Sequence, residues 1–378
     1  MGTEFYVGLL ALALIKATPL VYGALCGMLC ERSGVTNIGI EGMMLFGAFS
    51  AFLGAALIDQ WTGGVWPAQL YLVFGLLCAM VFTALVAALH AVLSIHYKID
   101  QVISGTVINL LAVGITNYVA NAYIDPTHLQ SAGVFSPISI PLLSKIPILG
   151  PILFTQQPLV YLMLILVVLL QYLVFNTPWG LRMRAVGEHP RAADTVGIGV
   201  LRTRYMNIII GGALAGIGGA VLVLESVGRF QKDITTGRGF IALAVLIFGK
   251  WTAVGSLGAA LLFGFAEALG VRLQFKDINQ VYALTVLVGL GVALLGVFWA
   301  LRKWVQRSHS KQPWWQIILA VVGGAGLVGI SQVVTFPNIN IPIEFLGLLP
   351  YILTVLILAG FVRRAVPPAA LGSVYEKH

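Results

Sequence analysis

Three stretches of the sequence carry polar side chains that could bind a solute or a protein partner. The first, 31–44 (ERSGVTNIGIEGMM), places two carboxylates, an arginine and an asparagine between two apolar runs, with glycines at 34, 39 and 42. This density of glycine indicates a break between helices, and non-helical backbone at membrane depth is tolerated only beside protein or a water-filled cavity. Asn37 and Glu41 are therefore candidates for a solute path, with a plain interfacial loop held by an ion pair as the alternative.

The second set lies inside apolar runs. Thr106, Asn109, Thr116 and Asn117 fall at spacings that can share one helix face, where they could hydrogen-bond a neutral polar solute. Hydrogen bonds between helices are the alternative role. A charge at the bilayer centre costs about 2.5–3.5 kcal/mol, so Glu267 should face protein or water, or be protonated.

The third stretch, 187–198 (GEHPRAADTVGI), predicts a short helix between two apolar runs. Pro190 suits a first helical position, Glu188 and His189 can satisfy or complement the free amides ahead of it, and Gly197 suits the end. The helix would present a small apolar ridge formed by Ala192, Ala193 and Val196. Such a ridge favours docking into a groove on another protein, because a helix lying on lipid headgroups would carry larger hydrophobic residues and more lysine.

No catalytic constellation is present. The sequence has no HExxH, GxSxG or paired CxxC, and its six histidines are scattered. The nucleotide-binding pattern GxxxxGK[ST] is missing as well, because Trp251 follows Gly249-Lys250. Cys26, Cys30 and Cys78 lie in apolar stretches and predict neither disulfides nor a metal site. We therefore expect no enzyme, no ATPase activity, no metal site and no cofactor bound by this chain.

The elements that must position these residues are membrane helices. Of 378 residues, 59% are apolar and 10% are charged, against about 25% charged in soluble domains. Apolar runs fall at about 5–29, 37–58, 68–93, 101–121, 158–175, 205–226, 239–250, 254–271, 280–301, 314–335 and 346–362. The sequence thus predicts an all-α, polytopic transmembrane bundle with about 9–11 spans. A dozen residues reach only about 18 Å, so 239–250 is expected to be a broken or partly buried helix.

Orientation follows from the basic residues, which are retained in cytoplasmic connections. The connection 176–204 contains Arg182, Arg184, Arg191, Arg202 and Arg204, and we expect it inside, with the N-terminus and the proline-rich connection 122–157 outside. The net charge of +8 then reflects orientation and contact with anionic lipid, not nucleic-acid binding. Glycine and alanine at four-residue spacing predict close helix crossings at Gly23 and Gly27, and at Gly211, Ala215 and Gly219.

Several stretches resemble the permease subunits of ABC importers, in the branch shared by simple-sugar, nucleoside and branched-chain amino-acid systems. They include ATPL at 17–20, ERSGVTNIGIEGMML at 31–45, DQVISGTVINLLAVGIT at 100–116, GLRMRAVGEHPRAADTVGI at 180–198, GRGFIALAVLIFGKW at 237–251, GFAEAL at 264–269 and LPYILTVLILAGFVRRAVPPAALG at 349–372. The nearest likeness is to bacterial nucleoside permeases of the basic-membrane-protein type. Simple sugars are the alternative substrates.

The resemblance implies a multi-pass protein of the bacterial inner membrane that works by alternating access. Its partners would be a cytoplasmic ABC ATPase that binds ATP and Mg, a second permease, identical or homologous, and an extracytoplasmic substrate-binding lipoprotein. It also implies that 187–198 is the coupling helix, and that the broken helix around Asn37 and Glu41 lies near the path. Coupling would then involve Gly187, Glu188, Pro190, Arg191, Ala192, Ala193, Thr195 and Gly197.

One region departs from the pattern of such permeases. About sixty residues, 280–340, separate GFAEAL from LPYILT, where a short connection is usual. We interpret the chain as one transmembrane domain, 1–378, with 176–204 as its coupling loop and 280–340 as an inserted pair of helices. Two other classes remain open: a proton-coupled secondary transporter using Glu267 or Glu41, which needs no docking helix, and a membrane scaffold, which leaves the broken helix unexplained.

Overall fold

The computed structural model describes residues 3–123, 133–272 and 365–376, together with single positions at 285, 322, 323, 326 and 348. Contacts divide the chain into two compact units, Met1–Ala268 with Leu353–His378, and Leu269–Ile352. The second unit lies almost entirely outside the described residues. The same holds for the apolar runs at 280–301, 314–335 and 346–362, so the inserted pair of helices at 280–340 stays a prediction.

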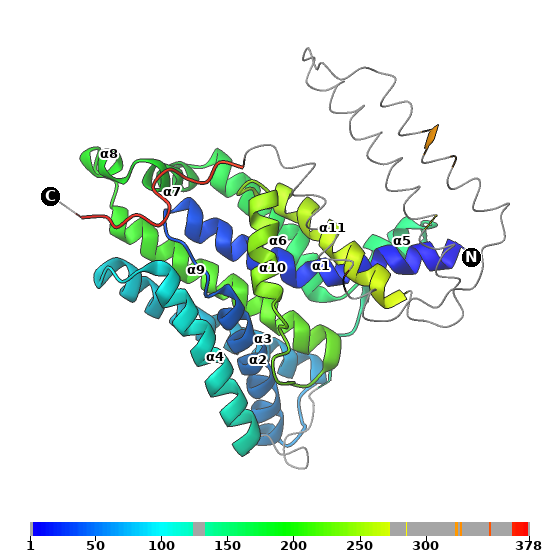
Figure 1. Cartoon of the computed structure of the whole chain (residues 1–378). Helices are drawn as coiled ribbons and strands as arrows, with labels where there is room; N and C mark the ends of the chain where they lie inside the picture. Colours follow the sequence, from blue (N-terminus) through cyan, green and yellow to red (C-terminus); the bar gives the residue numbers. More distant parts are fainter. Residues whose placement is uncertain are drawn as a thin grey trace. The chain divides into compact units, whose positions relative to one another are not determined.

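Seven helices in the described part of the chain are long and apolar enough to cross a membrane (Figure 1). They are α1 (Thr3–Arg32), α2 (Ile40–Thr62), α3 (Ala68–Ala91), α4 (Gln101–Tyr123), α6 (Pro158–Asn176), α9 (Val200–Val221) and α11 (Ala253–Arg272). The π-helical turns η1 (Val92–His96) and η3 (Leu222–Val227) extend α3 and α9. These helices confirm the predicted all-helical membrane bundle, although α9 begins five residues before the predicted run at 205–226.

Shorter elements connect the long helices. They are η2 (Leu143–Lys145), α5 (Leu149–Leu153), α7 (Pro178–Glu188), α8 (Pro190–Thr195) and α10 (Arg238–Phe248), and the strands β1 (Ile138–Ser139) and β2 (Thr155–Gln156), which pair antiparallel. With 11 residues, α10 spans only about 17 Å and cannot cross a bilayer alone. It confirms the short helix expected at 239–250.

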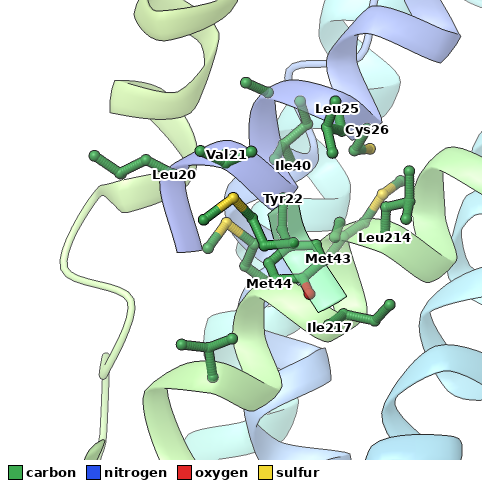
Figure 2. Close-up of a cluster of buried hydrophobic side chains, with 14 of the residues drawn as sticks. Leu20, Val21, Tyr22, Leu25, Cys26, Ile40, Met43, Met44, Leu214 and Ile217 are labelled. Carbon is green, nitrogen blue, oxygen red and sulfur yellow. The ribbon is translucent and has the colours of Figure 1, made fainter. Parts of the chain in front are cut away.

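The core lies where α1, α2 and α9 meet, and Figure 2 shows its side chains, among them Tyr22, Met43, Met44, Leu214 and Ile217. Backbones approach closely there. A Cβ at Gly219 would lie 1.9 Å from the main-chain oxygen of Met44, and one at Gly23 would lie 2.7 Å from the Ala242 methyl group on α10. The predicted close crossings at these glycines are confirmed, as expected in lipid, where small residues let helices pack.

Candidate translocation path and coupling site

The break between the first two helices forms a buried turn. α1 ends at Arg32, α2 begins at Ile40, and Gly34 has a φ of +88°, which glycine adopts without strain. Asn37 is fully buried, and Glu31 is 6% exposed. The predicted helix break is therefore confirmed, and it lies inside the protein.

The charged residues of this turn hold α10 at both ends. Main-chain amides of Gly237 and Gly239 donate to the two carboxylate oxygens of Glu41, at 2.9 and 2.6 Å. At the other end Arg32 donates to the carbonyls of Trp251 (3.0 Å) and Lys250 (3.4 Å), and the Trp251 indole donates to Glu31. An acid at the N-terminus and a base at the C-terminus complement the helix dipole. The carboxylates and the arginine thus bond to the start of α10 and to the turn that follows it, and not to one another as the ion-pair alternative required.

Asn109 fastens α4 to the same turn. Its amide nitrogen donates to the Ile38 carbonyl (3.1 Å), and its amide oxygen accepts from the Gly42 main-chain nitrogen (2.7 Å). Both polar atoms are thereby used in contacts between helices. The geometry of Asn109 matches the alternative that the sequence left open, a hydrogen bond between helices.

The other two candidate asparagines have polar atoms without partners. The Asn37 amide nitrogen faces the sulfur atoms of Cys30 (3.6 Å) and Met43 (3.5 Å), while its oxygen has no hydrogen-bond partner among the described residues. The Asn117 oxygen is likewise buried and unpaired within that part of the chain. It lies two turns along α4 from Asn109, about 12 Å away along the axis. Asn117 is thus separated from the turn, whereas Asn37 belongs to it.

Glu267 is paired with two cations. Its Oε1 lies 3.1 Å from Lys16 Nζ on α1 and 2.7 Å from an Arg238 guanidinium nitrogen at the start of α10. The three side chains are 18–30% exposed. Because Lys16 lies midway along α1, the group carries one net positive charge in the middle of a membrane helix. The sequence analysis singled out Glu267 but did not predict its partners. Lys16 could have been recognised as one of them, because it is a lone basic residue inside an apolar run.

Two short helices form the corner that the sequence assigned to coupling. α7 ends at Glu188 and α8 begins at Pro190, which occupies the first helical position, while Gly197 has a φ of +82° just after the helix. These ends confirm the predicted start and stop. The expected capping does not occur: the His189 side chain makes no cap hydrogen bond, and Glu188 accepts instead from the main-chain amide of Ala369 (3.0 Å).

The predicted ridge is wrong in one residue. Ala193 is 3% exposed and belongs to a buried cluster with Val186, Val200 and Tyr375. Val196 is 74% exposed, and Ala192 is exposed beside it. The outward face of the corner therefore comprises Arg191, Ala192, Thr195 and Val196, and Ala193 supports it from within.

The structure brings the coupling corner against the broken helix. A Cβ built on Gly187 would lie 2.2 Å from the Arg32 main-chain oxygen and 3.4 Å from the Gly34 nitrogen. The end of α7 and the end of α1 are therefore in direct backbone contact. Sequence reasoning did not find this junction, nor the buried Arg204 and the C-terminal segment that border it, because these residues are far apart along the chain.

Among the residues that the structure describes, no three His, Cys, Asp or Glu side chains come together as a metal site would need. The site instead consists of a short surface helix, a backbone junction between α7 and α1, and a broken helix, all within a bundle of helices long enough to cross a membrane. These features define a multi-pass helical membrane protein.

The family follows from comparison with known proteins. The family model described as "Branched-chain amino acid transport system / permease component" matches residues 9–295, and the chain belongs to this family. As a permease component, it is the membrane subunit of an ABC transporter of the bacterial inner membrane and is not itself an enzyme. No solved structure matches the chain.

Three relatives illustrate the range of this family. The guanosine ABC transporter permease protein NupQ of Bacillus subtilis is 42% identical over 72% of this chain and 85% of its own. The nucleoside ABC transporter permease protein NupC of Lactococcus lactis is 32% identical over 96% of this chain and 95% of its own. The putative glucose ABC transporter permease protein TsgC13 of Haloferax volcanii is 36% identical over 72% and 79%.

Proposed function

We propose that this chain is the membrane-spanning permease subunit of an ATP-driven importer of nucleosides. The observation that carries the proposal is similarity: a relative named for nucleosides matches nearly the whole chain, and one named for guanosine is 42% identical. Neutral polar substrates also suit a path with few charges, since 10% of the residues are charged.

ATP hydrolysis would act on the permease through α8. The exposed side chains Ala192 and Val196 are small enough to enter a groove on a cytoplasmic ATPase, which would bind ATP and Mg. Motion of α8 would reach the end of α7, where Gly187 touches the Arg32 carbonyl. From there it would reach the turn that contains Asn37 and Glu41. The five arginines of 176–204 support a cytoplasmic position for this corner.

The solute would pass between this chain and a second permease, identical or homologous, after delivery by an extracytoplasmic binding lipoprotein. On this chain, Asn117 is the candidate to contact it, because its amide oxygen is unpaired among the described residues and, unlike that of Asn37, lies outside the turn between α1 and α2. Asn109 has its polar atoms engaged with the turn. Its contribution to transport would therefore be to hold α4 against the broken helix.

Two alternatives are distinguished by specific observations. The relative named for glucose, at 36% identity, keeps simple sugars as a second candidate substrate. A proton-coupled transporter needs a carboxylate free to gain and lose a proton. Glu267 is bonded to Lys16 and Arg238, and Glu41 accepts from two main-chain amides, so neither carboxylate is free.

The test is uptake by the reconstituted complex. Proteoliposomes would contain this chain with a second permease, an ABC ATPase and a binding lipoprotein from the same organism, and would receive radiolabelled guanosine or glucose. We expect saturable guanosine uptake that needs hydrolysable ATP. Uptake of glucose alone would assign the chain to sugars, and uptake by this chain without an ATPase, driven by a proton gradient, would overturn the proposal.

A further inference from the structure

The C-terminal segment crosses the coupling corner. Residues 365–376, red in Figure 1, belong to the same compact unit as α1 to α10 and run beside α7 and α8. The main-chain amide of Ala370 donates to the Gly187 carbonyl (2.9 Å), and that of Gly372 donates to the Gly34 carbonyl (3.2 Å). One short segment thus bonds both to the end of α7 and to the turn between α1 and α2.

Tyr375 attaches the segment to α8. Its side chain is 8% exposed and lies in the buried cluster with Val186, Ala193 and Val200. The ring therefore lies in one cluster with Ala193 of α8, and its burial raises the pKa of the Tyr375 hydroxyl above the ordinary value of 10.0, so the side chain stays neutral at physiological pH.

Arg204 gives the segment a second attachment. This guanidinium is 2% exposed in the first turns of α9, and it donates to the Ser373 carbonyl at 3.1 Å. Its other two nitrogens have no hydrogen-bond partner among the described residues. Because a buried charge is costly without hydrogen bonds, the segment supplies an acceptor that this part of α9 needs. Lys98 and Glu376 add an exposed pair beyond it, which contributes little.

α8 needs such support because it is too short to be stable alone. It has 6 residues, whereas isolated helices below about 12–15 residues are marginal in water. Its buried face consists of Ala193, which packs with Val186 from α7, Val200 from α9 and Tyr375 from the C-terminal segment. The segment therefore provides one of the three surfaces on which α8 rests.

We propose that residues 369–376 form a strap that positions α8 on the α1–α2 turn, with Tyr375 as its main positioning residue. The strap packs against α8 through Tyr375 and hydrogen-bonds to the end of α7 and to Gly34, so a displacement of α8 is transmitted to the broken helix. The inference depends on the proposed function in one respect only, namely that a cytoplasmic ATPase moves α8.

The first test measures α8 itself and needs no transport. Amide hydrogen exchange in peptides covering 190–198 would be followed by mass spectrometry of the full chain in nanodiscs. Tyr375→Ala removes the ring from the cluster beside α8, and we expect exchange at least about tenfold faster, because truncating a buried aromatic side chain leaves a cavity. Tyr375→Leu keeps part of the apolar volume and should exchange faster than the wild type but more slowly than Tyr375→Ala. Val374→Ala is the matched control, because Val374 is 52% exposed and should leave exchange unchanged.

Exchange that is equal in the wild type and both Tyr375 variants would overturn the strap. If Tyr375→Ala does not fold, Tyr375→Leu decides alone, since leucine fills part of the cluster while the ring is removed. The exchange result does not depend on the proposed substrate. A complex that moves no nucleoside would refute the nucleoside assignment, but the exchange data would still show whether the strap holds α8.

The second test separates positioning from simple stability. In the reconstituted complex, solute moved per ATP hydrolysed would be compared between wild type, Tyr375→Leu and Val374→Ala. We expect Tyr375→Leu to assemble with the ATPase normally but to lower this ratio severalfold, because α8 is held less firmly on the α1–α2 turn. An unchanged ratio alongside faster exchange would overturn the role of the strap in coupling.

Discussion

The main-chain oxygen of Arg32 lies against Gly187, so closely that a methyl group on Gly187 would be 2.2 Å from it. Arg32 is the last residue of α1, and Gly187 is next to last in α7. Two residues more than a hundred and fifty positions apart in the sequence therefore meet at a backbone contact that only glycine permits. Because Arg32 also holds the end of α10, this junction joins the coupling corner to the membrane core.

Gly187→Ala should loosen that junction. The added methyl group meets backbone, which cannot rotate away, so we expect the free energy of unfolding to fall by about 1–3 kcal/mol. Thermal unfolding of the detergent-solubilised protein measures this. Gly258→Ala on α11 is the control, since a methyl group there meets nothing within 4 Å. Equal melting temperatures for both variants would contradict the close contact.

Glu41→Gln tests whether Glu41 supports α10 or binds solute. The glutamine loses the charge and one of the two acceptors that receive the Gly237 and Gly239 amides. We expect stability to fall by about 1–3 kcal/mol, with substrate affinity of the folded fraction unchanged. Glu4→Gln, at an exposed position, should be neutral. Normal stability combined with weaker substrate binding would indicate that Glu41 contacts the solute and does not support α10.

Glu267→Gln should leave two cations without their counter-ion. Removing one partner of a buried pair costs about 3–5 kcal/mol, and the partial exposure of these side chains should reduce this to about 1–3 kcal/mol. The double variant Lys16→Met, Glu267→Gln should recover part of the loss, because one unpaired charge is removed. A double variant as unstable as the sum of its single variants would argue against this pairing.

Asn109→Ala and Asn117→Ala should have opposite profiles. Asn109 makes two hydrogen bonds to the turn, so its loss should lower stability by about 1–3 kcal/mol. Loss of Asn117 removes an oxygen that is unpaired in the described structure and should leave stability nearly unchanged, while reducing nucleoside uptake. Melting temperature and uptake at matched expression distinguish the two. Normal uptake by Asn117→Ala would remove that residue from the proposed path.

Substitutions on α8 should depend on which way each residue faces. Val196→Glu and Ala192→Glu alter the exposed side, and we expect them to weaken association with the ATPase in a detergent pull-down without lowering stability. Ala193→Glu places a charge in the buried cluster and should destabilise the protein. Unchanged pull-down of the ATPase by both exposed-face variants would count against α8 as the docking element.

Features that depend on neighbouring residues could be predicted from the sequence, whereas features that depend on contacts between distant residues could not. Helix ends at Pro190 and Gly197 follow from local backbone preferences, and the long spans follow from hydrophobicity, so both were predicted within a few residues. The inward direction of Ala193 could not be predicted, because it depends on Tyr375 folding back across about 180 residues.

The same reason explains the charged residues of the first motif. Glu41 and its two amide donors are separated by almost 200 residues, and no local pattern indicates that a carboxylate in one turn will hold the N-terminus of a distant helix. Sequence reasoning therefore placed Glu41 near a solute path on the strength of its helix break. The predicted helix break was correct, whereas the hydrogen-bond partners of its charged residues are known only from the fold.

α10 is attached at both ends, because Glu41 accepts from the amides of Gly237 and Gly239, and Arg32 donates to the carbonyls of Lys250 and Trp251 in the turn that follows the helix. Between these ends its inner face packs closely on α1, where Ala242 and Leu246 lie against Gly23 and Gly27. A short helix held in this way is expected to move as a rigid body with the turn between α1 and α2, so that any displacement of the turn also displaces α10.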